Sequence, residues 1–414
     1  MGHLRRAENL IPLTVLFLGL VNPHPSAAFG YRAVLVFYFM LILTFLGIAL
    51  NLAYNRFPRI DPILGHLVLA FALAHTFSLI SAYGFWRELF GNERVFVSYF
   101  RFGNEHVLIP YLYLAYFLGI SADGRFLSKW IPYIFVSSIF FIFVTTLVDI
   151  FKEYNPIFRF GYRNIFFSPT ILTISLYLMY DDKNLLRRII YTLAVFLSVT
   201  LIILHGYRTS YLMVAVSVLL LIAYRWYKGQ NALAQALLVL LSFAFALALG
   251  LSLGYLMFGR PFLLFVFSRF SSILSTQVFI IDPSAQVRSY DISLAIGRFL
   301  LSPMFGRTEM DFLIRWIEGV WIFFIDNSFL NVLWKKGIFG LVIYVTMLAY
   351  ALYVVIKGVL NKNDFAFFTF LLFSSLLILS FASSSLIYYI HIAVLMICVG
   401  VLSRMLSEIP HQKS

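Results

Sequence analysis

The amino-acid sequence predicts an all-α protein with about twelve membrane-spanning helices and one large folded loop on the outer side of the membrane. Three observations lead to this fold class. Of the 414 residues, 62% are hydrophobic and only 12% are charged, whereas soluble proteins are about half apolar and about a quarter charged. The apolar residues form runs near the length of about 20 residues that crosses a bilayer. Turn-forming and charged residues separate these runs.

Each apolar run is expected to form one transmembrane helix. The runs cover residues 10–22, 31–53, 62–83, 104–120, 130–150, 164–180, 187–205, 209–226, 231–258, 328–356, 364–382 and 385–407. Residues 1–258 therefore hold predicted helices 1–9, and residues 328–414 hold helices 10–12 and a cytoplasmic tail. The first run follows Arg5-Arg6 like a signal peptide, and we interpret it as an uncleaved first helix.

The basic residues predict the orientation of the chain. With both termini in the cytoplasm, 15 basic residues fall in cytoplasmic segments and 8 in short outer loops, as the positive-inside rule requires. The net charge of +13 is thus interpreted as orienting the chain and meeting anionic lipids, not as nucleic-acid binding. The single cysteine, Cys398, excludes an intramolecular disulfide and a thiolate metal cluster.

Residues 259–327 interrupt the regular alternation of spans and short loops. A segment of this length is usually functional or disordered, and its recurring Phe, Ile, Leu and Trp indicate a folded one. Residues 261–281 are predicted to form an interfacial helix, and residues 287–300 a second short helix. Its arginines are Arg260, Arg269, Arg288, Arg298, Arg307 and Arg315. They predict an anionic ligand on the outer face.

Short motifs around this loop carry a resemblance to a known family. They are His205-Gly-Tyr-Arg-Thr-Ser210, then Arg288 followed by Leu301-Ser-Pro-Met-Phe-Gly306, then Asp326-Asn-Ser-Phe-Leu330 with Gly337-Ile-Phe-Gly340. With these motifs in this order along the sequence, the chain resembles the O-antigen polymerase and O-antigen ligase superfamily of bacterial surface-polysaccharide enzymes. Arg159-Phe-Gly-Tyr-Arg-Asn164, ahead of the sixth span, is similar to a further family element.

The resemblance implies a GT-C-like, metal-independent glycosyltransferase without a cofactor, located in the bacterial inner membrane with its active site on the periplasmic face. Its donor would be an oligosaccharide linked to undecaprenyl pyrophosphate. Its acceptor would be a second lipid-linked repeat unit in a polymerase, or lipid A–core in a ligase. Membrane lipids and a chain-length regulator would be further partners, and nucleic acid would not.

The resemblance also implies roles for individual residues. Arg208 and Arg288 would engage the pyrophosphate, and Asp326 stands where ligases carry a His that activates the acceptor, which favours a polymerase. The expected substrate-binding residues are Arg159, Arg163, Arg298, Arg307, Asn327 and Ser328. Arginine suits this chemistry because its planar fork pairs bidentately with phosphate oxygens, and a carboxylate can accept the proton of the acceptor hydroxyl. Other carboxylates of the loop remain alternatives for that base: Asp282, Asp291, Glu309, Asp311 and Glu318.

Each assignment has a plainer alternative. Arg208 would serve as an interfacial anchor, Arg288 would lie on a solvated helix face, and Asp326 would cap the following helix. Gly337 and Gly340 would permit close helix packing. At the level of function, the alternatives are a ligase, a protein O-oligosaccharyltransferase or a lipid-linked oligosaccharide flippase. The two halves show no internal repeat, and most span interiors lack charges, which disfavours a transporter.

Overall fold

A computed structural model describes most of the chain. The described residues are 2–21, 31–53, 61–90, 108–153, 165–205, 207–230, 232–274, 283–308, 311, 313–315, 320–322, 325–382 and 391–408. The first half contains α1 (Gly2–Val21), α2 (Tyr31–Ala53), α3 (Pro62–Phe90), the 3₁₀ helix η2 (Ile109–Leu114), α5 (Ala115–Ser121), α6 (Gly124–Glu153), η3 (Ile165–Phe167), α7 (Ser168–Asp181), α8 (Leu185–His205), α9 (Arg208–Tyr227) and α10 (Ala232–Phe258). The second half contains α11 (Arg260–Leu274), α13 (Pro283–Leu300), the strands β1 (Leu313–Arg315) and β2 (Val320–Ile322), α14 (Ser328–Leu360), α15 (Asp364–Ala382) and α17 (His391–Glu408).

The helices coincide with the apolar runs of the sequence, since each run overlaps a helical segment. Among the described residues, eight helical segments are long and apolar enough to cross a bilayer: Leu35–Ala53, Pro62–Ala82, Gly124–Leu147, Leu185–Leu204, Arg208–Tyr227, Ser328–Leu360, Asp364–Phe381 and His391–Glu408. Shorter apolar helices cover Asn9–Val21, Ile109–Ser121 and Leu240–Leu256. The protein is therefore a helical, multi-pass membrane protein.

Two helices, α7 and α17, contain long stretches that are buried on all sides. Every residue of α17 from His391 to Ser403 is buried, and so is every residue of α7 from Ser168 to Tyr177. A helix that is apolar on most sides can be covered by neighbouring helices or by lipid, and in these two stretches neighbouring parts of the protein provide the cover. The α17 helix packs on α5 at glycines, because a Cβ on Gly119 or Gly400 would overlap a backbone carbonyl of the facing helix.

The outer helices present apolar side chains away from the protein. Leu73, Ile80, Phe245 and Leu256 are each more than 60% exposed. Water would disfavour so much contiguous apolar surface, whereas lipid chains solvate it well. This pattern agrees with the position of these helices in a bilayer.

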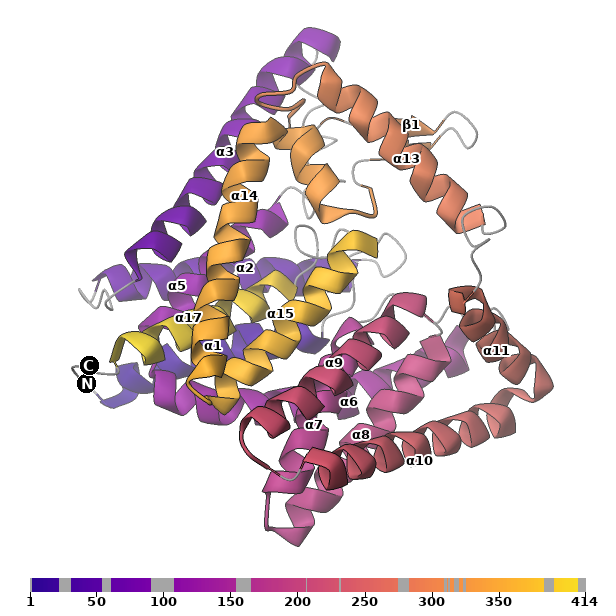
Figure 1. The fold of residues 1–414 in the computed structure, drawn as a ribbon. Helices are drawn as coiled ribbons and strands as arrows, with labels where there is room; N and C mark the ends of the chain where they lie inside the picture. The colour runs from indigo at the N-terminus through magenta and orange to yellow at the C-terminus, as the bar shows by residue number, and fades with distance from the viewer. Residues whose placement is uncertain are drawn as a thin grey trace.

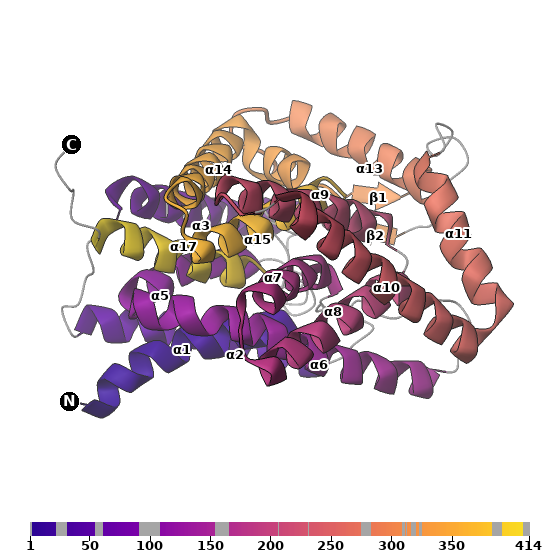
Figure 2. The ribbon, with the colours of Figure 1, turned by 60° about the horizontal axis from the view of Figure 1, so that its bottom comes forward.

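The long segment between α10 and α14 is folded where the structure describes it. Figure 1 shows α11 beside the end of α10, and α13 with the hairpin beside the top of α14. The strands pair antiparallel, with Leu313 opposite Ile322 and Arg315 opposite Val320. The all-α prediction missed this hairpin, while α11 and α13 lie where short helices were expected. In Figure 2, α13, β1 and α14 lie on the face opposite α1, α2 and α6.

Candidate functional site

An ion pair between two of the predicted catalytic residues marks the candidate site. Arg288 projects from the first half of α13, and Asp326 lies just before α14. The Nε atom of Arg288 donates to Oδ2 of Asp326 over 3.1 Å. The two side chains remain 48% and 42% exposed, so a ligand from solution can reach both charges. A pair this exposed contributes little stability, and exchanging its partners for those of a ligand costs little free energy.

Asp326 is not the cap of α14, contrary to the plainer alternative for this residue. The N-cap is Asn327, whose φ of −157° and ψ of 117° are extended and whose side chain accepts from the Leu330 N–H. Asparagine satisfies one of the free N–H groups of a first helical turn in this way. The side-chain oxygen of Asn327, predicted to bind substrate, thus serves the helix, and the carboxylate of Asp326 is available to Arg288.

The backbone that carries Asp326 is held in place by Asn331, a residue that the sequence analysis did not single out. Asn331 is fully buried in the first turn of α14. Its amide NH₂ donates to the carbonyl oxygens of Ile325 (2.6 Å) and Asn327 (2.7 Å), and its Oδ1 accepts from the Ile325 N–H (2.9 Å). These bonds bracket Asp326 on both sides. No motif of the sequence marks this role, because the bonds of Asn331 go to backbone groups and not to a recognisable side-chain partner.

Two further arginines of the predicted site, Arg298 and Arg307, converge on Asp311. The Nη1 atom of Arg298 lies 4.0 Å from Oδ1 of Asp311, and the Nε atom of Arg307 lies 3.9 Å from Oδ2. The indole N–H of Trp334 donates to the same Oδ2 over 2.8 Å. The Asp311 side chain is only 2% exposed. A buried carboxylate requires such compensation, so these arginines help to hold the loop against α14.

The turn that follows α13 docks on a break in α14. Gly337, inside α14, has a φ of 67°, and Gly306 of the turn has a φ of 75°. The break frees the carbonyls of Trp334 and Lys335, which accept from the N–H groups of Arg307 (3.0 Å) and Thr308 (3.1 Å). It also frees the N–H groups of Ile338 and Phe339, which donate to the carbonyls of Pro303 (2.9 Å) and Met304 (3.2 Å). The turn thereby satisfies both sides of the break.

The two glycines allow this contact because their backbones touch. A Cβ on Gly337 would overlap the carbonyl of Met304, and a Cβ on Gly306 would overlap the carbonyl of Lys335. Both residues also have a positive φ, which glycine adopts without strain. Gly337 was expected to permit helix packing, but it permits the docking of the loop on a broken helix.

Burial separates the candidate bases of the loop. Asp291 and Asp311 are 3% and 1% exposed, so a sugar hydroxyl cannot approach their oxygens. Asp326 is the loop carboxylate that solvent reaches among those in the described part of the chain. Asp282, Glu309 and Glu318 lie outside the described residues.

The remaining predicted site residues have different surroundings. Arg208 is the first residue of α9, which packs on α7, α10, α11 and α15, and α13 packs on α14. Ser328 is fully buried at the start of α14. Arg159 and Arg163 lie outside the described residues. Of the predicted catalytic residues, the structure thus joins Arg288 to Asp326.

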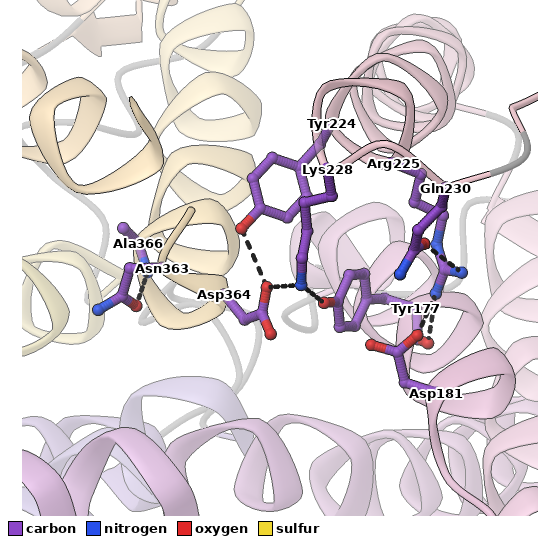
Figure 3. A network of polar contacts seen from close by, with 9 residues as sticks. All are labelled: Tyr177, Asp181, Tyr224, Arg225, Lys228, Gln230, Asn363, Asp364 and Ala366. Atoms are coloured by element: carbon purple, nitrogen blue, oxygen red, sulfur yellow. Dashed lines mark hydrogen bonds and ion pairs between the residues drawn. The ribbon is translucent and has the colours of Figure 1, made fainter. Parts of the chain in front are cut away.

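A second polar cluster lies where α7 and α9 end and α15 begins (Figure 3). The Nη2 atom of Arg225, a residue only 2% exposed, donates to the Tyr177 carbonyl (2.8 Å) and to Asp181 (3.3 Å). The Nζ atom of Lys228 donates to Asp364 (2.8 Å) and to the Tyr177 hydroxyl (3.0 Å). Each cation faces one carboxylate, so the cluster ties three helices together without excess charge. Arg225 and Lys228 are among the 15 basic residues of the predicted cytoplasmic segments, where only an orienting role was expected.

The Arg288–Asp326 pair is suited to one kind of chemistry. An accessible guanidinium binds phosphate oxygens, and the adjacent carboxylate accepts a proton. No model of a known protein family matches the chain, and a search of curated proteins finds no significant match.

Proposed function

We propose that the protein is a surface-polysaccharide polymerase of the O-antigen type. It transfers a glycan from undecaprenyl pyrophosphate to a hydroxyl of a second lipid-linked repeat unit. The contact between Arg288 and Asp326 carries this proposal, because it joins a phosphate-binding group and a proton acceptor on one accessible surface. The family resemblance supports a GT-C-like enzyme with about twelve spans and an active site at the periplasmic face of the bacterial inner membrane.

The ion pair suggests how the two residues work in sequence. When the donor binds, its pyrophosphate takes the place of the Asp326 carboxylate on Arg288. The acceptor oxygen then attacks the anomeric carbon, and the bond from that carbon to the pyrophosphate oxygen breaks. Undecaprenyl pyrophosphate leaves with the bonding electrons, and the hydroxyl proton passes to Asp326. In this proposal Arg208 is a further contact of the pyrophosphate. A chain-length regulator is a further partner and acts on the growing glycan.

The test is polymerisation by the purified protein in proteoliposomes, with lipid-linked oligosaccharides extracted from the host as substrate. Arg288→Ala and Asp326→Asn should each lower the rate about 10²–10³-fold, as loss of one preorganised charge partner does in other enzymes. Arg187→Ala is the control. Arg187 is 55% exposed beside the second cluster, so this variant should polymerise at the wild-type rate.

Two results would overturn the assignment. Normal product ladders from Arg288→Ala would remove the proposed phosphate contact. Normal ladders from Asp326→Asn would remove Asp326 as the base and leave the pair with a structural role.

A further inference from the structure

Four large apolar side chains are exposed at the end of α13 and in the turn that follows it. Leu300 and Leu301 are 65% and 64% exposed, and Met304 and Phe305 are 57% and 63% exposed. Residues 299–306 include no charged side chain. Water disfavours a contiguous apolar cluster of this kind, so the cluster indicates a contact with an apolar partner.

The turn lies beside the membrane-spanning part of α3. The hydroxyl of Ser78 in α3 donates to the Lys335 carbonyl (3.5 Å), which also accepts from the Thr308 N–H at the end of the turn (3.1 Å). Ser78 belongs to Pro62–Ala82, the part of α3 that is long and apolar enough to cross a membrane. Phe305 and several residues of this segment line one cavity between α3 and α14. The turn is therefore level with a transmembrane segment.

The exposed apolar surfaces of both neighbouring helices pass the turn. Leu73, Phe77 and Ile80 of α3 are 68%, 61% and 68% exposed, and their spacing of three or four residues places them on one face of the helix. Phe339 of α14 is 55% exposed, and its ring centroid lies 6.3 Å from that of Phe305. The apolar cluster of the turn thus continues the surface that α3 and α14 present to lipid, which identifies the partner as lipid chains.

The backbone of the turn has hydrogen bonds of the kind that a lipid environment requires, since lipid chains offer no partner to an N–H or a carbonyl. Pro303 has no N–H, and its carbonyl and that of Met304 accept from α14. The N–H of Gly306 donates to the Ser302 carbonyl (2.9 Å), and the N–H of Ser302 donates to the Phe299 carbonyl (3.0 Å). These groups can leave water without losing their partners.

We propose that residues 300–305 insert into the membrane leaflet nearest the loop, with their four large apolar side chains among the acyl chains of the surrounding lipids. Arg298 and Arg307 flank the turn, and both lie within 4.0 Å of the Asp311 carboxylate, so their charges are compensated beside the membrane. The inserted turn anchors one end of α13, the helix that carries Arg288, and thereby fixes the depth of the Arg288 side chain relative to the bilayer surface. This inference does not depend on the proposed polymerase activity.

Fluorescence quenching of the full-length protein in lipid nanodiscs tests the proposal, with the dye NBD attached to the Met304→Cys variant. The wild type gives the background of labelling, because Cys398 is only 2% exposed. Lipids with a nitroxide on the acyl chain should quench the dye at position 304 several-fold more strongly than iodide in the water does. Ser293→Cys is the matched control on the same helix. Ser293 is exposed near the exposed and polar Ser289, so the dye at position 293 should be quenched mainly by iodide.

Three results would overturn the proposal. The first is stronger quenching by iodide than by the lipid nitroxide at position 304, and the second is the same quenching pattern at positions 304 and 293. The third is protection from both quenchers at position 304, which would show that a second copy of the protein covers the turn. If Met304→Cys does not fold, Leu301→Cys provides the same test, because Leu301 belongs to the same exposed cluster.

Discussion

The two ends of α14 carry ionic groups in opposite environments. At its start, Arg288 and Asp326 form one contact and remain about half exposed. Beyond its end, Arg225 and Lys228 are 2% and 21% exposed, and each donates to a carboxylate and to a group of Tyr177 (Figure 3). The first pair can exchange its partners for a ligand at low cost. The second cluster cannot, because a ligand would have to replace several contacts at once.

The difference in accessibility is what makes the first pair a candidate binding site and the second cluster a structural contact between helices. Both places contain basic and acidic residues at helix ends, and their compositions are alike. In the second cluster the donors and acceptors come from α7, α9 and α15, so their contacts join helices that are distant in sequence. In the first, Asn331 holds the backbone of Asp326 while the charged groups face outward.

The largest expected effect on stability is that of Arg225→Met. The substitution removes the donor to Tyr177 and leaves Asp181 without its cation. Breaking a buried ion pair costs about 3–5 kcal/mol, and the partial exposure of Asp181, 34%, places the expected loss near the lower value. The measurement is the unfolding temperature in detergent. Arg187→Met, which breaks the exposed contact with Asp182, should cost less than about 1 kcal/mol; equal losses from both variants would contradict the comparison.

An intermediate effect is expected for Asn331→Leu. Leucine has a similar size but leaves the Ile325 N–H and the carbonyls of Ile325 and Asn327 without this partner. An unsatisfied buried group costs about 1–3 kcal/mol, so we expect a loss of about 2 kcal/mol together with loss of polymerisation, because Asp326 shifts. Asn327→Ala removes only the cap and should cost about 1 kcal/mol. If Asn331→Leu retained both stability and activity, Asn331 would not position Asp326.

The smallest effect on stability is expected for the reversed pair, Arg288→Asp combined with Asp326→Arg. The exposed contact can reform in the opposite sense, so the free energy of unfolding should change by less than about 1 kcal/mol. Polymerisation should nevertheless be lost, because the phosphate contact and the proton acceptor have exchanged places. Circular dichroism melting measures the stability, and the proteoliposome assay measures polymerisation, both on the same preparation. Recovery of polymerisation by the double variant would show that the pair is only structural.

The sequence alone predicted a helical, multi-pass membrane protein and the positions of its apolar helices, because apolar run length is a local property that a bilayer imposes. It also selected Arg288 and Asp326, which the fold brings together from α13 and the start of α14. The grouping of Arg298 and Arg307 around Asp311 was not predictable. That contact depends on Trp334 and on the docked turn, and neither leaves a local pattern.

Other features required the tertiary structure for the same reason. Whether Asp326 or Asn327 caps α14 depends on the backbone angles of single residues, and both residue types are good caps. The close contact of Gly119 and Gly400 joins helices far apart in the chain. Arg225 lies at the end of an apolar run like any orienting charge, and only the positions of Tyr177 and Asp181 give it a structural role.

The docking of Gly306 on Gly337 has a consequence for how this protein can vary. Each glycine leaves room for the backbone beside the other, so a side chain at either position would separate the turn from α14. A related protein that docks its turn in this way should therefore carry glycine at both positions. Exchange of the segment between α10 and α14 among such proteins should succeed only when the first turns of α14 are transplanted with it.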